Sequence, residues 1–174
     1  MPDPITDLDE VRRLAQEHRG RFDLLRAMLE RSKKLNDARF DAYVETTAAP
    51  IIAAIDCTKC ANCCRSLDVY LIEEDAKRLS EGLMIPLIEI ETRYVDQEAA
   101  AEEEEWGLFR QRPCAFLDGK LCSVYAHRPE SCRIYPAFTP DFRWTLEDTI
   151  EGSSICPIIY NVLTALCDRL LPRG

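Results

Sequence analysis

The sequence has little glycine and histidine, and it lacks several motifs that mark large enzyme families. Its six glycines stand singly among 174 residues, so it has no phosphate-cradling loop and no dinucleotide fingerprint. Two histidines are too few for an iron centre built on histidine and carboxylate ligands, and the H-E-x-x-H and G-x-S-x-G motifs are missing. No apolar run reaches the length of a membrane span, so we expect no association with a membrane.

Positive charge is also scarce in the chain as a whole. The net charge is -9, whereas a general nucleic-acid binder needs a basic face to neutralise phosphates, so we expect no nucleic acid as a partner. Residues 1–7 are acidic and polar, unlike the basic and then apolar start of a signal peptide, and we expect a cytoplasmic protein. Thiols stay reduced in the cytosol, so the nine cysteines indicate metal or redox chemistry rather than a disulfide framework.

The cysteines are spaced as metal ligands, beginning with the segment CTKCANCC at residues 57–64. Cys57, Cys60 and Cys63 form C-x2-C-x2-C, the spacing with which ferredoxin-type runs bind three corners of an iron–sulfur cluster. Cys156, which precedes a proline, is a candidate for a fourth ligand from far along the chain. Four thiolates would equally satisfy zinc. The spacing therefore predicts a metal site and leaves two cofactors open, an iron–sulfur cluster, which we favour, and zinc.

Cys64 is interpreted as part of a second site or as a free reactive thiol. Side chains of adjacent residues point apart on an extended or helical backbone, so we expect Cys63 and Cys64 not to bind one ion together. Cys167 lies in an amphipathic C-terminal segment and is predicted to be a core residue. The remaining eight cysteines, enough for two four-cysteine sites, are the predicted metal ligands: Cys57, Cys60, Cys63, Cys64, Cys114, Cys122, Cys132 and Cys156.

Basic residues gather around the cysteines. Segments 57–65 and 106–133 contain only two acidic residues against seven basic ones, which are Lys59, Arg65, Arg110, Arg112, Lys120, Arg128 and Arg133. Nearby positive charge lowers the pKa of thiols and offsets the charge of several thiolates, which is the interpretation we favour. In the alternative, some of these arginines receive an anionic substrate, because arginine binds carboxylate and phosphate bidentately. His127 is next to the ligands, but thiolates suffice in number, so we expect it not to bind metal.

Hydrophobic periodicity predicts a fold that is mostly α with minor β (α+β), a small metal-organised domain. Residues 6–56 are predicted to form an antiparallel helical hairpin, whose second helix ends at Pro50. Further helices are expected from Glu73 onward, over residues 86–101 and over residues 156–171.

A short β-hairpin is predicted from the stretch CAFLDGKLC, with an Asp-Gly turn at 118–119. Such a turn would bring Cys114 and Cys122 close together. We expect two domains, an N-terminal helical hairpin extension over residues 1–56 and a cysteine-cluster metal-binding domain over residues 57–174.

Apolar residues recur at steps of three and four along the first predicted helix. The seam consists of Leu8, Val11, Ala15, His18, Phe22, Leu25 and Leu29. We interpret it as packing within the hairpin and onto the domain. The alternative is a surface for a protein partner, or for a homodimer formed through the N-terminal helices.

Three segments taken together resemble one known family: CTKCANCC, then RPCAFLDGKLCSVYAHRPESCRIYP, then ICP. They resemble the bacterial CxxCxxCC cysteine-cluster (YkgJ-type) family, which is described as zinc- or iron-chelating and is related to a domain in flagellin lysine N-methylases. The second segment also fits the family pattern C-x-x-Y-x-x-R-P-x-x-C-R-x-Y-P outside its cysteines, at Tyr125, Arg128, Pro129, Arg133, Tyr135 and Pro136. The resemblance covers residues 57–157 and implies a metal-binding domain.

Three functions remain open at this point. The first is a metal-binding protein with a redox, sensing or metal-handling role and a protein partner. The second, implied by the resemblance, is methyl transfer to protein lysine, so whether the chain is an enzyme is left open. The third is a structural zinc module that presents residues 1–56 to a partner.

Overall fold

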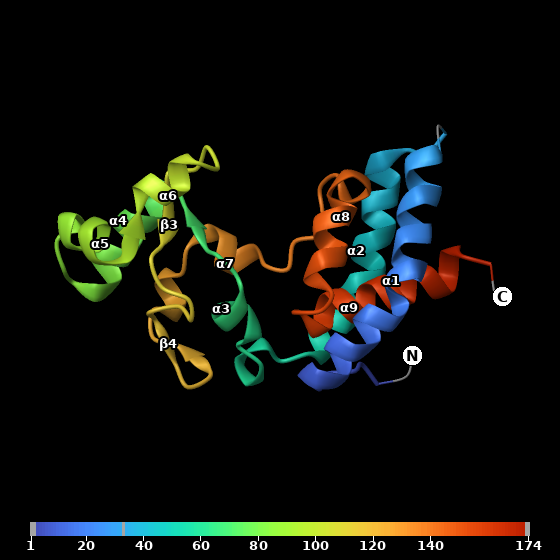
Figure 1. Cartoon of the computed structure of the whole chain (residues 1–174), viewed down its shortest axis with the longest axis horizontal. Helices are drawn as coiled ribbons and strands as arrows, with labels where there is room; N and C mark the ends of the chain where they lie inside the picture. Colours follow the sequence, from blue (N-terminus) through green and yellow to red (C-terminus); the bar gives the residue numbers. More distant parts are fainter. Residues whose placement is uncertain (1–2, 33, 173–174) are drawn as a thin grey trace. The chain divides into compact units, whose positions relative to one another are not determined.

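The computed structural model describes residues 3–32 and 34–172, and it confirms a fold that is mostly α with minor β. The chain forms two compact units, shown in Figure 1. The helical unit consists of the chain up to Asp56 together with the chain from Pro136, and the cysteine unit is Cys57–Tyr135. Over the described ranges, no helix is both long enough and apolar enough to cross a membrane.

The helical unit packs helices from the two ends of the chain together. They are α1 (Leu8–Arg31), α2 (Asp37–Ala54), α8 (Phe142–Gly152) and α9 (Pro157–Leu170). At the start of α1, the Asp7 carboxylate accepts a hydrogen bond of 2.9 Å from the backbone of Glu10. The Asn36 side chain accepts one of 2.9 Å from the backbone of Arg39 and caps the start of α2. Helix α9 begins with Pro157, where the missing N–H would have no partner in any case.

The apolar seam of α1 packs inside its own unit, against α8 and α9 (Figure 1). Its buried members are Val11, Ala15, Phe22, Leu25 and Leu29. His18, at the edge of the seam, has its Nδ1 atom 3.1 Å from the hydroxyl of the buried Tyr160. The seam therefore packs onto helices from the C-terminal part of the chain rather than onto α2, as packing within a hairpin would require. A homodimer through these helices stays a prediction.

Helix α8 was not among the helices predicted from periodicity. It does carry a helical stripe, because Phe142, Leu146 and Ile150 are spaced by four residues and are all buried. Its first turn is capped from α2, where the Asp41 carboxylate accepts hydrogen bonds of 2.8 and 3.1 Å from the backbone of Asp141 and Phe142. A cap supplied 100 residues away leaves no local start signal in the sequence.

The predicted end of the second helix at Pro50 is wrong. Helix α2 runs through Pro50 to Ala54. Proline inside a helix removes one backbone hydrogen bond. Ala48 and Ile51 on either side of it are buried, and α2 packs along α9, so the burial of this face outweighs the local break.

The cysteine unit is built from short elements. Its helical segments are η1 (Cys57–Lys59), α3 (Asn62–Ser66), α4 (Glu73–Leu83), α5 (Leu87–Tyr94), α6 (Gln97–Ala101), η2 (Tyr125–His127) and α7 (Glu130–Ile134). Its strands are β1 (Tyr70–Leu71), β2 (Val95–Asp96), β3 (Gly107–Phe109), β4 (Leu117–Asp118) and β5 (Leu121–Cys122). Strands β1, β3 and β2 form an antiparallel sheet in that order, and α4 packs against α5 (Figure 1). The apolar core of the unit lies among these elements and includes Leu71, Leu79, Ile90 and Phe109.

The helix predicted over residues 86–101 is interrupted. Val95 and Asp96 leave the helical path to pair with β3, with Val95 opposite Phe109. The Asp96 carboxylate then accepts a hydrogen bond of 3.1 Å from the backbone of Ala99 and starts α6. Pairing with a strand that follows later in the chain overrides the helical periodicity here.

The predicted β-hairpin is confirmed, with a shift of one residue in its turn. Asp118 pairs with Leu121, so the two connecting residues are Gly119 and Lys120. Gly119 has φ of +60°, a backbone conformation that favours glycine.

The compact units do not follow the expected domains along the whole chain. Residues 57–174 were expected to form one domain, whereas the segment from Pro136 onward belongs to the helical unit. The reason is burial, because α8 and α9 cover the apolar faces of α1 and α2.

Candidate metal centre

Six of the nine cysteines line one pocket in the cysteine unit. They are Cys57, Cys63, Cys64, Cys114, Cys122 and Cys132, and the pocket has a volume of about 180 Å³. The buried side chains of Phe109, Phe116 and Val124 contribute apolar walls. Thiolate sulfur is the donor that zinc and iron–sulfur sites use, so the pocket gathers donors of one suitable kind.

The turn before the β4–β5 hairpin and the hairpin itself position Cys114 and Cys122. The backbone N–H of Leu117 donates a 3.0 Å hydrogen bond to the carbonyl of Cys114 and closes the turn. Cys122 lies in β5, opposite Leu117. As predicted, both thiols reach the same pocket.

The segment that carries the first cysteines is a tight double turn. Helix η1 is followed by Ala61 in the left-handed conformation, with φ of 53°, and then by α3. Arg65 fixes this segment, because its guanidinium donates to the carbonyl of Cys60 at 2.9 Å and to that of Gly119 at 2.7 Å. The N–H of Cys114 donates a 2.8 Å hydrogen bond to the carbonyl of Cys64. These contacts join the first cysteines to the hairpin.

The expectation that Cys63 and Cys64 point apart is wrong. Their Sγ atoms lie 3.9 Å from each other at the start of α3. Two sulfurs on one tetrahedral ion with bonds of about 2.3 Å are about 3.8 Å apart. The separation of the two neighbouring sulfurs therefore suits joint binding of one ion.

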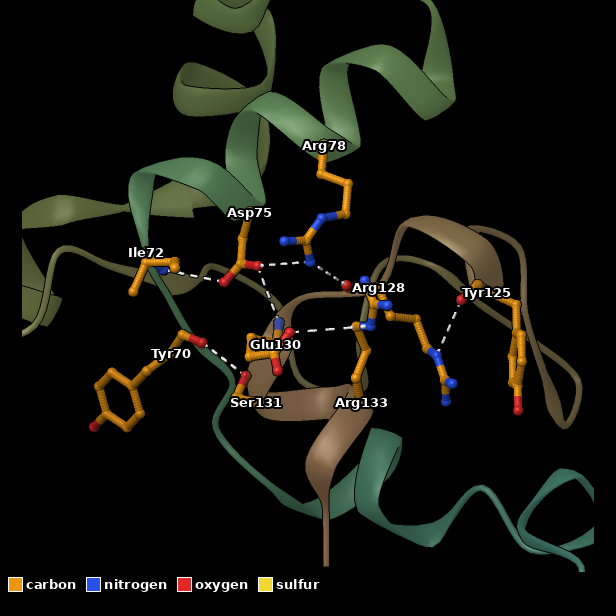
Figure 2. Close-up of polar contacts among 9 residues, drawn as sticks. All are labelled: Tyr70, Ile72, Asp75, Arg78, Tyr125, Arg128, Glu130, Ser131 and Arg133. Carbon is orange, nitrogen blue, oxygen red and sulfur yellow. Dashed lines mark hydrogen bonds and ion pairs between the residues drawn. The ribbon is translucent and has the colours of Figure 1, made fainter. Parts of the chain in front are cut away.

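Helix α4 anchors the segment that carries Arg128 and Cys132 (Figure 2). The buried Asp75 carboxylate accepts hydrogen bonds of 3.1 Å from the backbone of Ile72 and of 3.0 Å from the backbone of Glu130. It also pairs with Arg78 at 3.2 Å, and Arg78 donates in turn to the carbonyl of Arg128 at 3.2 Å. One carboxylate thus caps α4 and fixes the first residue of α7.

Two further contacts join this segment to its surroundings. The Ser131 hydroxyl donates a 2.8 Å hydrogen bond to the carbonyl of Tyr70 in β1 (Figure 2). His127 packs on Gly82 of α4 so closely that a Cβ at Gly82 would lie within 3.0 Å of the histidine side chain. His127 is not among the pocket residues.

The thiols of the pocket differ in acidity. A hydrogen bond with Cys63 lowers the pKa of Cys64 to about 6, with a smaller contribution from the positive charge of Arg128 and Arg65. Burial raises the pKa of Cys114 and of Cys122. Burial, together with the charge of the neighbouring thiols, raises the pKa of Cys132 to about 12. A metal ion that enters the pocket would therefore meet the most acidic of these four thiols at Cys64 and would have to displace protons from Cys114, Cys122 and Cys132 to bind them.

Only some of the basic residues that are near the cysteines in sequence lie at the pocket. Arg110 pairs with Asp96 at 3.2 Å and Arg112 with Asp68 at 3.1 Å, so neither is committed to the thiols. Arg128 lines the pocket and lowers the pKa of Cys64. Charge compensation thus rests on fewer residues than the sequence suggests.

Thiol sulfur atoms are suitable ligands for zinc or iron, but the thiols of the pocket do not converge on one point in this structure. Within residues 3–32 and 34–172, no three histidine, cysteine, aspartate or glutamate side chains stand together as ligands of an ion. Six thiols on one pocket, two of them 3.9 Å apart, nevertheless supply more than the four donors that such an ion needs. Changes in side-chain rotamer, or small shifts of the turns, would be needed to complete a site.

Two predicted ligands lie outside the pocket walls. Cys60 is in the double turn, with its carbonyl bonded to Arg65. Cys156 precedes α9 in the helical unit, is 8% exposed, and stays a predicted ligand. Cys167, the predicted core residue, is fully buried.

Sequence reasoning missed the residues that hold the pocket together from α4. Asp75 stands third in the acidic run that opens α4, and nothing local distinguishes it from its exposed neighbours. Gly82 gave a weak signal, because glycine inside a predicted helix often marks a close approach of another segment.

The fold and the pocket together define a small helical protein with a cysteine-lined metal-binding region. A family model named CxxCxxCC and described as a "putative zinc- or iron-chelating domain" matches residues 56–157, more than half of the chain. The chain belongs to this family. No curated protein and no solved structure matches the chain.

Proposed function

We propose that the cysteine unit binds a zinc or iron ion through thiolates of its pocket and has a metal-handling or redox role. The observation that carries this proposal is the convergence of six thiols from four separate segments on one cavity. Thiolates stay available for metal only in a reducing compartment, so we place the protein in the cytoplasm.

The partial exposure of the thiols supports an active rather than a purely structural site. Structural zinc sites are closed by four protein ligands, whereas catalytic sites keep a position open. Cys57 is exposed, and the other five thiols of the pocket are partly exposed. A metal held there stays within reach of a small ligand or of a protein partner that exchanges it.

A single ion is the form that the geometry favours. The 3.9 Å between the sulfurs of Cys63 and Cys64 is close to the separation on one tetrahedral ion. In a cubane cluster each thiolate binds a different iron, so neighbouring ligands stand further apart. An iron–sulfur cluster is the second candidate, favoured by the C-x2-C-x2-C spacing of Cys57, Cys60 and Cys63.

The surrounding residues have defined parts in this account. A bound zinc or iron ion would supply Lewis acidity or, in the case of iron, electron transfer. Arg128 and Arg65 offset the negative charge of the thiolates. Phe109 and Phe116 keep part of the pocket apolar, which strengthens these electrostatic interactions.

Serine substitutions test the proposal through metal content measured after purification without oxygen. We expect Cys64→Ser and Cys132→Ser to lose most of the zinc or iron, because a serine hydroxyl is a poor substitute for a thiolate ligand. Cys167→Ser is the matched control, since that thiol is buried in the helical unit and should not alter metal content. Full metal content in both pocket variants would contradict the proposal.

Cys60→Ser separates the two candidate centres. A single ion on the pocket thiols should survive this change, because Cys60 is not part of the pocket wall. A cluster bound by Cys57, Cys60 and Cys63 should lose both iron and acid-labile sulfide. Circular dichroism of each variant shows whether its helices have formed.

A further inference from the structure

One arginine of the pocket has a guanidinium group whose terminal nitrogens are available for a ligand. Arg128 lines the pocket beside the thiols. Its Nε donates a 3.1 Å hydrogen bond to the carbonyl of Tyr125, and its Cζ lies 3.7 Å from the centroid of the Tyr125 ring. Figure 2 shows the Nε bond. Within the part of the chain that the structure describes, neither of the terminal nitrogens of Arg128 has a hydrogen-bond or ion-pair partner.

Other arginines of the cysteine unit have carbonyl or carboxylate partners within the protein. Arg65 donates to two carbonyl groups, and Arg78 pairs with the buried Asp75. Arg110 and Arg112 each pair with an aspartate. Arg128 differs because stacking and one hydrogen bond fix its plane while the fork of terminal nitrogens stays available.

The backbone of Arg128 is also held in place. Its carbonyl accepts a 3.2 Å hydrogen bond from Arg78, and Pro129 restricts the chain directly after it. The next residue, Glu130, is bonded through its N–H to Asp75. A guanidinium fixed at both its backbone and its Nε loses little freedom when it binds a ligand.

The charge inside the pocket favours an anion. Lys120 also lines it, and its ammonium group has no partner among the described residues. Asp68 is the carboxylate on the pocket wall, and it is already paired with Arg112 at 3.1 Å. The volume of about 180 Å³ exceeds by far the roughly 10–15 Å³ needed for one water-sized sphere, so a metal ion and a small ligand fit together.

We infer that Arg128, oriented by Tyr125 and assisted by Lys120, is an anion-binding subsite next to the metal centre. Its ligand is a small molecule with a carboxylate or phosphate group, whose two oxygens match the fork of the guanidinium. This inference rests on the proposed function and extends it, since it names the class of ligand that reaches the open side of the metal.

The test is a titration of the protein as purified, with its metal content measured beforehand. The probes are inorganic phosphate and acetate, each added in place of chloride at constant ionic strength. Binding is followed through the NMR signal of the Arg128 Nε–H, which is assigned from its loss in Arg128→Lys. We expect a saturable shift with at least one probe, and the stronger probe tells phosphate from carboxylate as the preferred group.

Variants show whether the binding belongs to this arginine. By calorimetry, Arg128→Gln should weaken binding of the same probe by a factor of about ten or more, because a charge-assisted pair is lost. Arg110→Gln removes an equal charge from an ion pair with Asp96, and because neither residue lines the pocket, it should leave the affinity unchanged.

Three results would overturn the inference. They are no saturable binding of either probe, binding that persists in Arg128→Gln, and loss of metal in Arg128→Gln from a protein that binds neither probe. The last result would make Arg128 only the counter-charge of the thiolates. If the proposed function is wrong, the wild-type protein will contain neither zinc nor iron. The titration would still show in that case whether Arg128 binds an anion.

Discussion

Gly82 does not line the pocket, but it packs against the residue directly before Arg128. It lies in α4, where the side chain of His127 occupies the space that a Cβ would take. His127 ends the turn η2, directly before Arg128. The absence of a side chain at Gly82 therefore lets η2 lie close to α4.

Gly82→Ala is expected to destabilise the cysteine unit. Alanine normally stabilises a helix by about 1 kcal/mol relative to glycine. Here the new Cβ would meet the Cβ and ring of His127, and overpacking of this kind costs about 1–3 kcal/mol. Denaturant unfolding measures the change in the free energy of unfolding.

Gly20→Ala is the matched control, because Gly20 lies in helix α1 and a Cβ added there would have no neighbouring atom within 4 Å. It should stabilise the protein by the ordinary helix preference of up to about 1 kcal/mol. The double variant Gly82→Ala, His127→Ala should recover most of the loss. A Gly82→Ala protein as stable as Gly20→Ala would show that the contact with His127 is unimportant.

At the scale of elements, helix α4 holds the segment 125–132 in place. Asp75, Arg78 and Gly82, which lie on this helix, each meet that segment through a different contact (Figure 2 shows the polar ones). Part of the metal pocket is thus arranged by contacts that involve no cysteine.

Asp75→Asn is expected to lower the free energy of unfolding by about 1–3 kcal/mol. One carboxylate oxygen accepts from Ile72, and the other accepts from Glu130 and Arg78. Asparagine has one carbonyl oxygen, so its amide nitrogen would face an N–H donor in either orientation. Hydrogen exchange should show that the backbone around Glu130 loses protection.

Asp68→Asn provides the comparison for this prediction. It removes the same charge from a pair with Arg112 in which both side chains are about half exposed. Exposed pairs contribute about 0–1 kcal/mol, so this change should be small. Equal effects of the two substitutions would mean that Asp75 does not organise the segment.

Elements with a local signal were predictable from the sequence. The Asn36 cap, the seam of α1 and the hairpin around Gly119 depend on neighbours within a few residues. The end of α2 and the break at Val95 were not, because distant packing and strand pairing decide them.

At the scale of the molecule, the candidate site also has features that local sequence predicts and features that distant contacts decide. Cysteine spacing indicated the metal, and the family match over residues 56–157 agrees with it. The gathering of Cys114, Cys122 and Cys132 with Cys63 and Cys64 depends on contacts between segments, which spacing does not reveal. The grouping of the chain from Pro136 with α1 and α2 depends on buried faces in the same way.

The two units differ in what they contain. The helical unit buries a conventional apolar core, which includes Phe22, Phe142 and Leu163. The cysteine unit has shorter elements and contains the pocket with its thiols and Arg128. The central claim is that these thiols bind a metal.

X-ray absorption spectroscopy at the metal edge, on protein purified without oxygen, tests that claim most directly. The account predicts zinc or iron with a first shell of about three sulfur atoms at about 2.3 Å, or four where no position is left open. A second shell of iron would identify the cluster form of the same thiolate site. A first shell of nitrogen and oxygen alone, or protein without bound metal, would contradict the account.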